Sequence, residues 1–220
     1  IDNTNQLNNF SLTDSEKEYV EKQLKDDQEA SLFRYPNLLF FHKTKKDKKH
    51  LQAESARKAG ATFFELLKKE KIKTVQISEL NKEELTIPFL EGLLLAGYSF
   101  SKYKKKKEDY LPDEIFIADD AVKIEQITEL VQLTEAVFHA RNLINEPLSF
   151  LTAEKLAEEI EKMGNDAGFS VEVFNKKKIE SLRMGGLLAV NKGSVDPPTF
   201  SILEWKPENA KLYQLNVTKA

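Results

Sequence analysis

Hydrophobic and polar positions along this chain follow two periods, one typical of strands and one typical of helices. Short apolar runs at 37–42 and 114–117 indicate strands, as does the alternating segment 72–77. Over 51–70 and 121–145 the apolar positions recur at helical spacing. Strands and helices therefore alternate, which predicts an α/β fold with a largely parallel sheet.

Capping and stop residues mark the ends of the predicted helices. Thr13–Glu16 has the spacing of a capping box, which predicts a helix to about residue 25. Asn81–Glu84 has a similar spacing before the apolar run 85–95. That run predicts a deeply packed helix, which Gly97 should end.

The second half of the chain is predicted to continue the alternation. Pro147 should end the long helix, because the residue before a proline avoids helical torsions. Thr152 should cap a helix over 153–163, which Gly164 closes. The elements predicted after it are strands at 171–174, 184–190 and 199–205 and a short helix at 176–183.

The long helical segment is the natural boundary between two domains. We predict an N-terminal α/β domain over 1–120, a linker helix over 121–147, and the start of a second domain over 148–220.

Composition narrows the possible functions. The 220 residues carry a net charge of −3 and include no cysteine, which excludes disulfides and thiolate catalysis. The near-balance of charge gives no reason to expect nucleic-acid binding. No apolar run approaches the roughly 20 residues that span a bilayer, and no signal peptide is visible. We therefore expect a cytoplasmic protein with neither a membrane nor a nucleic acid as partner.

Few residues could carry catalytic or metal chemistry, and they form no recognisable motif. The histidines lack paired ligand spacing. Ser194 has no histidine near it in the sequence and is interpreted as a turn residue. The acidic pair could supply oxygen ligands, but its position before a helix favours capping. We therefore predict no catalytic, substrate-binding or metal residue in this chain. The residues considered are His42, His50, His139, Ser194, Asp119 and Asp120.

Two lysine-rich runs, at 43–49 and 102–107, are the other candidate binding feature. Acidic residues interrupt or end both runs, so we interpret them as solvated loops. The segment 191–194 lacks the spacing of a phosphate-binding loop, which leaves a dinucleotide site almost without support.

Several coupled motifs in the second half resemble one enzyme family. Over 140–209 they closely resemble the start of the catalytic domain of the leucyl aminopeptidases, the two-metal M17 peptidases. The first 120 residues match more loosely and look like that family's N-terminal domain, which is similar to macro domains in fold. The motifs are Ala140-Arg141-x-Leu143-x-Asn145-x-Pro147, Leu151–Ala157, Met184–Val190 with Gly193-Ser194, and Asp196–Thr199 before Leu203–Pro207.

The resemblance implies a fold and an activity. The fold is α/β: a macro-like three-layer N-terminal α/β domain, a long linker helix, and the first βα elements of a truncated second α/β domain. Members of the family remove N-terminal residues, often leucine, from peptides, and two divalent ions, zinc or manganese, activate the attacking water. The resemblance also implies a homo-oligomer, a hexamer in the family.

The metal ligands of the family come after this stretch, and no counterpart of them is found before residue 220. The tail after 209 departs from the family pattern, which suggests a truncation or a frameshift. We therefore predict the N-terminal portion of a metallo-aminopeptidase that holds no cofactor, is inactive alone, and serves assembly and domain packing.

Two alternatives stay open. One is a free-standing macro-like domain that binds a nucleotide or nucleic acid. The other is a different enzyme that uses Asp119, Asp120 and His139.

Overall fold

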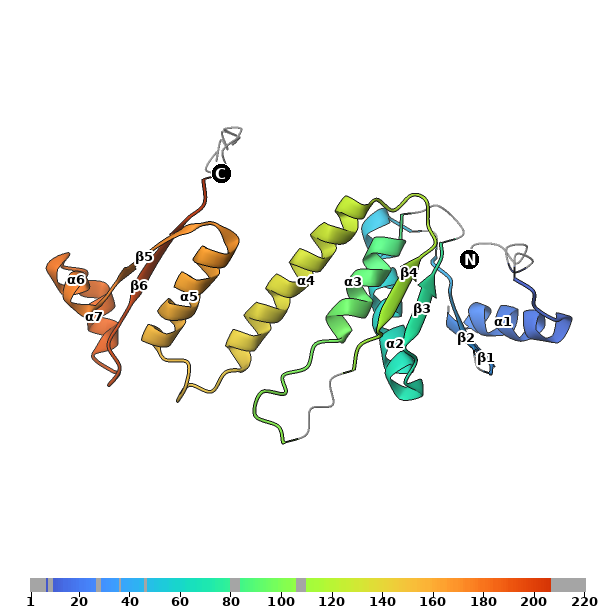
Figure 1. The fold of residues 1–220 in the computed structure, drawn as a ribbon, viewed down its shortest axis with the longest axis horizontal. Coiled ribbons are helices and arrows are strands. Elements are labelled where there is room, and N and C mark those ends of the chain that lie inside the picture. Colours follow the sequence, from blue (N-terminus) through green and yellow to red (C-terminus); the bar gives the residue numbers. More distant parts are fainter. Residues whose placement is uncertain are drawn as a thin grey trace. The chain divides into compact units, whose positions relative to one another are not determined.

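Figure 1 shows the computed structural model, which describes residue 7 and residues 10–26, 29–35, 37–45, 47–79, 84–105 and 110–206. The chain forms two compact units, 1–142 and 143–220. The predicted domain boundaries at 120 and 147 stay predictions. No helix in the described ranges is long and apolar enough to cross a bilayer.

The first unit carries an antiparallel hairpin and a parallel strand pair. β1 pairs with β2 from Glu29 opposite His42 to Arg34 opposite Asn37, and β3 pairs with β4 in parallel. The mixed α/β class is confirmed, but a largely parallel sheet is wrong for the described residues, because only β3 and β4 are parallel. The elements are α1 (Asp14–Asp26), β1 (Glu29–Arg34), β2 (Asn37–His42), α2 (Lys49–Glu70), β3 (Thr74–Ile77), α3 (Thr86–Ala96), β4 (Glu114–Ile117) and α4 (Ile124–Asn145).

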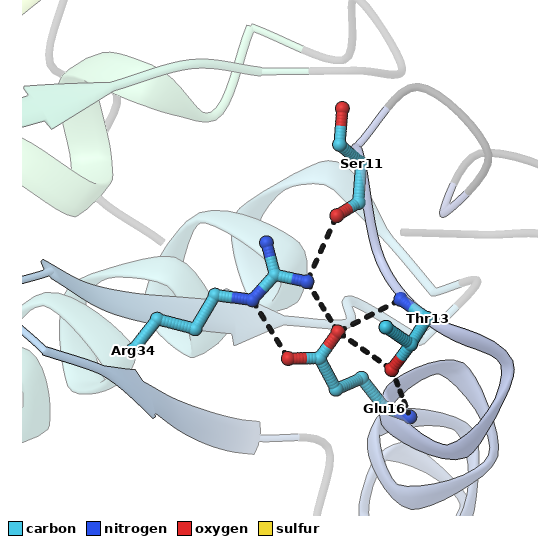
Figure 2. Close-up of polar contacts among 4 residues, drawn as sticks. All are labelled: Ser11, Thr13, Glu16 and Arg34. Atoms are coloured by element: carbon cyan, nitrogen blue, oxygen red, sulfur yellow. Dashed lines mark hydrogen bonds and ion pairs between the residues drawn. The ribbon is translucent and has the colours of Figure 1, made fainter.

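A capping box and an ion pair fix the start of α1, as Figure 2 shows. The Thr13 amide donates to Oε2 of Glu16 at 2.8 Å, and the Glu16 amide donates to Oγ1 of Thr13 at 3.4 Å, which confirms the predicted box. Arg34 on β1 donates through Nε to Oε1 of Glu16 at 2.7 Å and through Nη2 to Oε2. These hydrogen bonds lower the pKa of the Glu16 carboxyl to about 2. The pair therefore ties α1 to the hairpin.

Two apolar clusters form the core of the first unit, and β2 contributes to both. The first cluster joins α1 to the hairpin and includes Val20, Leu24 and Phe41. The second lies among α2, α3 and β3 and includes Phe63 and Leu93, with Phe40 of β2 packed against it. Successive side chains of a strand point to opposite faces, so both faces of β2 are covered by apolar side chains.

Helices α2 and α3 lie side by side in Figure 1 and touch at two buried glycines. A Cβ at Gly60 would lie 2.0 Å from the Phe89 carbonyl oxygen, and one at Gly92 would lie 1.9 Å from the Arg57 carbonyl oxygen. Both positions therefore need glycine, because the backbone of the neighbouring helix occupies the space of a side chain.

The second unit packs helices against a small antiparallel sheet. β5 pairs with β6, from Ser170 opposite Glu204 to Phe174 opposite Phe200. Thr152 caps α5 as predicted, since its Oγ1 accepts from the Lys155 amide at 3.3 Å. The elements are α5 (Ala153–Ala167), β5 (Ser170–Phe174), α6 (Lys176–Ser181), α7 (Gly185–Asn191) and β6 (Phe200–Glu204).

Two predictions for this unit are wrong. The segment 184–190, predicted as a strand, forms α7, because its leucines and alanine favour helix and so short an apolar run fits either structure. Gly164 does not close α5, which continues to Gly168 at a φ of 78°. A Cβ at Gly164 would lie 2.6 Å from the Val171 side chain, so this glycine lets the helix pack on β5.

Candidate functional site

The first unit contains a cavity of about 720 Å³ between the hairpin and the β3–β4 pair. All residues of β2 and β3 line it, together with Ala56 and Phe63 of α2 and the start of α3. The lining is mostly apolar, and its acidic residue, Glu79, lies just beyond the carboxyl end of β3. Open α/β folds bind ligands outside the carboxyl ends of their strands, so this end is the candidate site.

Two carboxylates meet at one buried hydroxyl there. Glu79 follows β3, Asp119 follows β4, and Thr86, only 3% exposed, opens α3. The Thr86 hydroxyl lies 2.6 Å from Oδ2 of Asp119 and 3.2 Å from Oε2 of Glu79. A hydroxyl has one proton to donate, so we assign it to the shorter contact with Asp119. Oε2 of Glu79 accepts instead from the Leu85 and Thr86 amides, at 2.8 and 3.2 Å.

Glu79 therefore caps α3. Most of the predicted capping segment, 81–83, lies outside the described residues, and the helix itself begins at Thr86. A carboxylate thus occupies the positive end of the helix dipole, where a phosphate group would bind. Asp119 adds a second negative charge, so this end of the cavity disfavours an anionic nucleotide.

His42 also lines the cavity, at the end of β2. Its Nε2 lies 3.4 Å from Oγ of Ser55, and its Nδ1 lies 3.9 Å from Oε1 of Glu29. Burial lowers the pKa of His42 to about 4, so the ring is neutral at pH 7 and does not form an ion pair with Glu29. The order serine, histidine, glutamate is that of a hydrolase triad. However, the 3.9 Å separation exceeds hydrogen-bond reach and the ring is a weak base, so we read the contact as structural.

The acidic pair Asp119 and Asp120 does not cap α4. Oδ1 of Asp119 accepts from the Ala121 amide at 3.0 Å, which closes a turn, and Asp120 is exposed. At the start of α4 the Lys123 amide donates instead to Oε1 of Gln126 at 3.0 Å. The predicted capping role is therefore wrong, because the helix begins several residues after the pair.

The other residues considered from the sequence lie on separate elements. His50 is exposed at the start of α2, and His139 is half-buried on α4. The Ser194 hydroxyl accepts from the Asp196 amide at 3.1 Å, which confirms a turn. In the part of the chain that the structure describes, no three histidine, aspartate or glutamate side chains gather as a metal site would require.

The lysine-rich runs are largely exposed to solvent where they are described. Lys48 and Lys49 lie at the start of α2, and Lys102, Lys104 and Lys105 lie in the loop after α3. Residues 46 and 106–109 lie outside the described residues. The interpretation as solvated segments is confirmed for the other described lysines but not for Lys43, which is half-buried, and the first run extends into a helix.

Two sequence models of one family match this chain, in chain order. The N-terminal domain of the cytosol aminopeptidase family matches residues 45–107, and the catalytic domain of that family matches residues 138–217. Together they cover more than half of the chain. The second match also continues past residue 209, where the resemblance was expected to end.

Curated proteins that are similar to this chain are named as probable cytosol aminopeptidases. The chain is 39% identical over 142 residues to a probable cytosol aminopeptidase of Chloroherpeton thalassium, covering 56% of this chain and 28% of the relative. It is 31% identical over 170 residues to that of Aquifex aeolicus, covering 73% and 33%. Over 69 residues it is 58% identical to that of Chlorobaculum parvum, covering 31% and 14%. The chain therefore spans a third or less of the length of these relatives.

Solved structures share the fold. A tomato leucine aminopeptidase variant matches with a TM-score of 0.68 at 15% identity, covering 87% of this chain and 41% of that one. The bottromycin maturation enzyme BotP in complex with Mn matches with a TM-score of 0.67 at 20% identity, covering 82% and 40%. Identities this low show the fold alone. Together with the two domain matches and the curated relatives, they lead to the conclusion that this chain belongs to the cytosol aminopeptidase family, M17, and carries its N-terminal domain and part of its catalytic domain.

Proposed function

We propose that this chain is the N-terminal portion of a metal-dependent aminopeptidase that removes N-terminal residues from peptides. The observation that carries the proposal is the pair of domain matches, N-terminal then catalytic, on one chain. The relatives are named cytosol aminopeptidases, which supports both the peptide substrate and a cytoplasmic location. Because the chain spans a third or less of those relatives, the activity is proposed for the whole protein.

The metal ions of such an enzyme do not fit the described residues. Each ion of a two-metal site needs several oxygen or nitrogen ligands. Glu79 and Asp119 offer only two carboxylates, and both already accept hydrogen bonds from Thr86 or backbone amides. We therefore propose no metal ligand and no catalytic residue here. The Mn complex of BotP supports manganese as the metal of the whole protein, with zinc as the alternative.

The role proposed for this portion is assembly and domain packing within a homo-oligomer, a hexamer. Exposed apolar side chains in the second unit support the domain-packing part of this role. On and after β6, Ile202, Leu203 and Trp205 are 41%, 51% and 71% exposed. Ile202 and Leu203 point to opposite faces of the strand, as expected of an inner strand of a larger sheet that is covered on both sides.

The nucleotide-binding alternative is not favoured. Its phosphate would have to bind where the Glu79 carboxylate already caps α3. None of the described lysines in the two lysine-rich runs lines the cavity. The alternative that combines Asp119, Asp120 and His139 has no cluster of these side chains to support it in the described ranges.

Hydrolysis of leucine p-nitroanilide tests the proposal. The chain is assayed with and without Mn²⁺, beside the Aquifex aeolicus relative as a positive control. We expect turnover by the control and none above buffer by this chain. Turnover by the chain that a chelator abolishes would contradict the proposal. In that case Glu79→Gln and Asp119→Asn are the first variants to assay.

A further inference from the structure

Helix α4 has only a small share in the apolar core of the first unit. It has 22 residues, of which Leu130 and Thr134 are buried. As far as the described residues go, neither apolar core cluster includes a residue of this helix. Helices in proteins are stabilised mainly by the packing of an apolar face. Contacts other than those of the two clusters therefore help to hold α4 on the first unit.

One tyrosine, in the loop after α3, contacts one face of the last turns of α4. The centroid of the Tyr98 ring lies 5.2 Å from that of Phe138 and 5.3 Å from Cζ of Arg141. The Tyr98 hydroxyl donates to Oδ1 of Asn142 at 3.0 Å. Residues three and four apart are neighbours on a helix surface, so positions 138, 141 and 142 share one face. A single side chain therefore engages a whole turn of α4.

Arg141 extends this contact to α3 itself. Its Nη1 donates to the Leu95 carbonyl at 2.9 Å. Leu95 lies in the last turn of α3, where carbonyls have no partner within the helix and the dipole is negative. The guanidinium therefore caps α3 while it lies against the Tyr98 ring. This contact gives a structural role to one residue of the motif Ala140–Pro147, which the sequence analysis singled out.

These contacts stand directly before the boundary between the two units. The first unit ends at Asn142, and the second begins at Leu143, in the last turn of α4. Segments that bury few apolar contacts open locally at a lower free energy than the core of a domain. Because the core clusters lie elsewhere, detaching α4 leaves the core of the first unit in place.

We propose that Tyr98 and Arg141 form a latch that holds α4 on the end of α3. When the latch opens, α4 leaves the first unit and the core of that unit stays folded. The start of the second unit then moves with the helix. This role does not depend on the activity proposed for the whole protein.

Amide hydrogen exchange of the chain 1–220, followed residue by residue by NMR, is the first test. Tyr98→Ala should speed exchange of the α4 amides from Leu130 to Phe138 by roughly tenfold, because an aromatic pair, a cation–π contact and a hydrogen bond are lost together. The amides of Phe64 and Leu67, in the second core cluster, should be unchanged.

The distance between two spin labels, measured by pulsed electron paramagnetic resonance, is the second test. The chain has no cysteine, so labels attach only at Lys58→Cys on α2 and Glu135→Cys on α4, both exposed positions. We expect a narrow distance distribution in the parent and a broader one with Tyr98→Ala. Tyr103→Ala is the matched control and should change neither measurement, since Tyr103 lies in the same loop, is 56% exposed and packs its ring against Phe100.

Two milder variants decide the matter if Tyr98→Ala does not fold. Tyr98→Phe removes the hydroxyl, and Arg141→Lys removes the planar guanidinium that joins the Tyr98 ring to the α3 carbonyl. Each should speed exchange in α4 by about threefold and leave the core amides unchanged.

Three results would overturn the proposal. One is exchange in α4 that is no faster in the latch variants than in the Tyr103→Ala control. Another is equal acceleration of the α4 and core amides, which would show that α4 opens only with the whole unit. The third is a distance distribution that does not broaden, which would mean that the helix frays without leaving the first unit.

Discussion

Replacing Gly92 with alanine tests whether α2 and α3 pack backbone against backbone. The added Cβ would lie 1.9 Å from the carbonyl oxygen of Arg57 and 2.6 Å from its carbonyl carbon. Even a close contact between a carbon and a carbonyl oxygen measures about 3.3 Å. The two helices must therefore separate by more than about 1 Å where they cross.

Two opposing effects set the magnitude. Alanine in a helix interior is more stable than glycine by about 1 kcal/mol. Overpacking at a tight contact costs about 1–3 kcal/mol, and here the nearest atoms belong to backbone that cannot rotate away. Separating the helices also loosens the contacts of Leu93, which is fully buried in the second cluster. Because the backbone of Arg57 cannot move aside, we take the cost at its upper end, about 3 kcal/mol, and expect a net loss of about 2 kcal/mol in the free energy of unfolding.

Urea unfolding followed by circular dichroism measures the loss. Gly186→Ala is the matched control, since it lies in helix α7 and its Cβ would meet nothing within 4 Å. The control should be unchanged or slightly stabilised. Combining Gly60→Ala with Gly92→Ala should cost less than the two single losses together, because the first separation relieves part of the second clash. A Gly92→Ala variant as stable as the parent would refute the described crossing.

Three further predictions follow from named contacts. The folded pKa of Glu16, about 2, lies below its ordinary value of 4.5, so its contribution to stability is complete above pH 4.5 and is lost as pH falls toward 2. Thermal unfolding between pH 2 and 6 should therefore show a shallower acid loss for Glu16→Gln, and equal slopes would contradict the ion pair. Thr86→Val should lower stability to urea by about 2 kcal/mol, because a hydrogen bond to a charged group contributes roughly 1.5–3 kcal/mol. This loss of stability should be smaller when Thr86→Val is made in an Asp119→Asn background. An unchanged loss would mean that Asp119 is not the acceptor of the Thr86 hydroxyl. Thr152→Ala should destabilise α5 by about 1 kcal/mol, seen as faster exchange of the Lys155 amide, and unchanged exchange would argue against the cap.

Sequence reasoning succeeded where the signal and the structure are both local. The Thr13–Glu16 box and the Thr152 cap each depend on residues within one helical turn. It failed where pairing decides the structure. Residues 29–34 show no clean alternation, and they become β1 because the turn brings them beside β2. The run 184–190 fits either structure, and the structure places a helix there.

The candidate site illustrates the same limit at longer range. Asp119 was considered from the sequence, but Glu79 and Thr86 were not, although all three meet. A usable signal was present, since Glu79 and Asp119 each stand two residues after a strand. Carboxyl ends of parallel strands meet at one edge, so a parallel β3–β4 pair would have brought these residues together. The pairing itself could not be deduced from periodicity.

The hydrogen bonds at the polar end of the cavity in the first unit indicate whether its carboxylates serve folding or ligand binding. A small-molecule site keeps donors and acceptors available to its ligand. Here the Glu79 carboxylate is used by the start of α3, and Asp119 is used by Thr86 and by a turn. What the described residues leave unpaired or uncovered is of another kind. In the first unit the strands of each pair have no further described strand beside them, and in the second unit apolar side chains on β6 are exposed. Backbone edges and apolar faces are satisfied by more polypeptide. These features support the proposed portion of a larger protein over a free-standing nucleotide-binding domain.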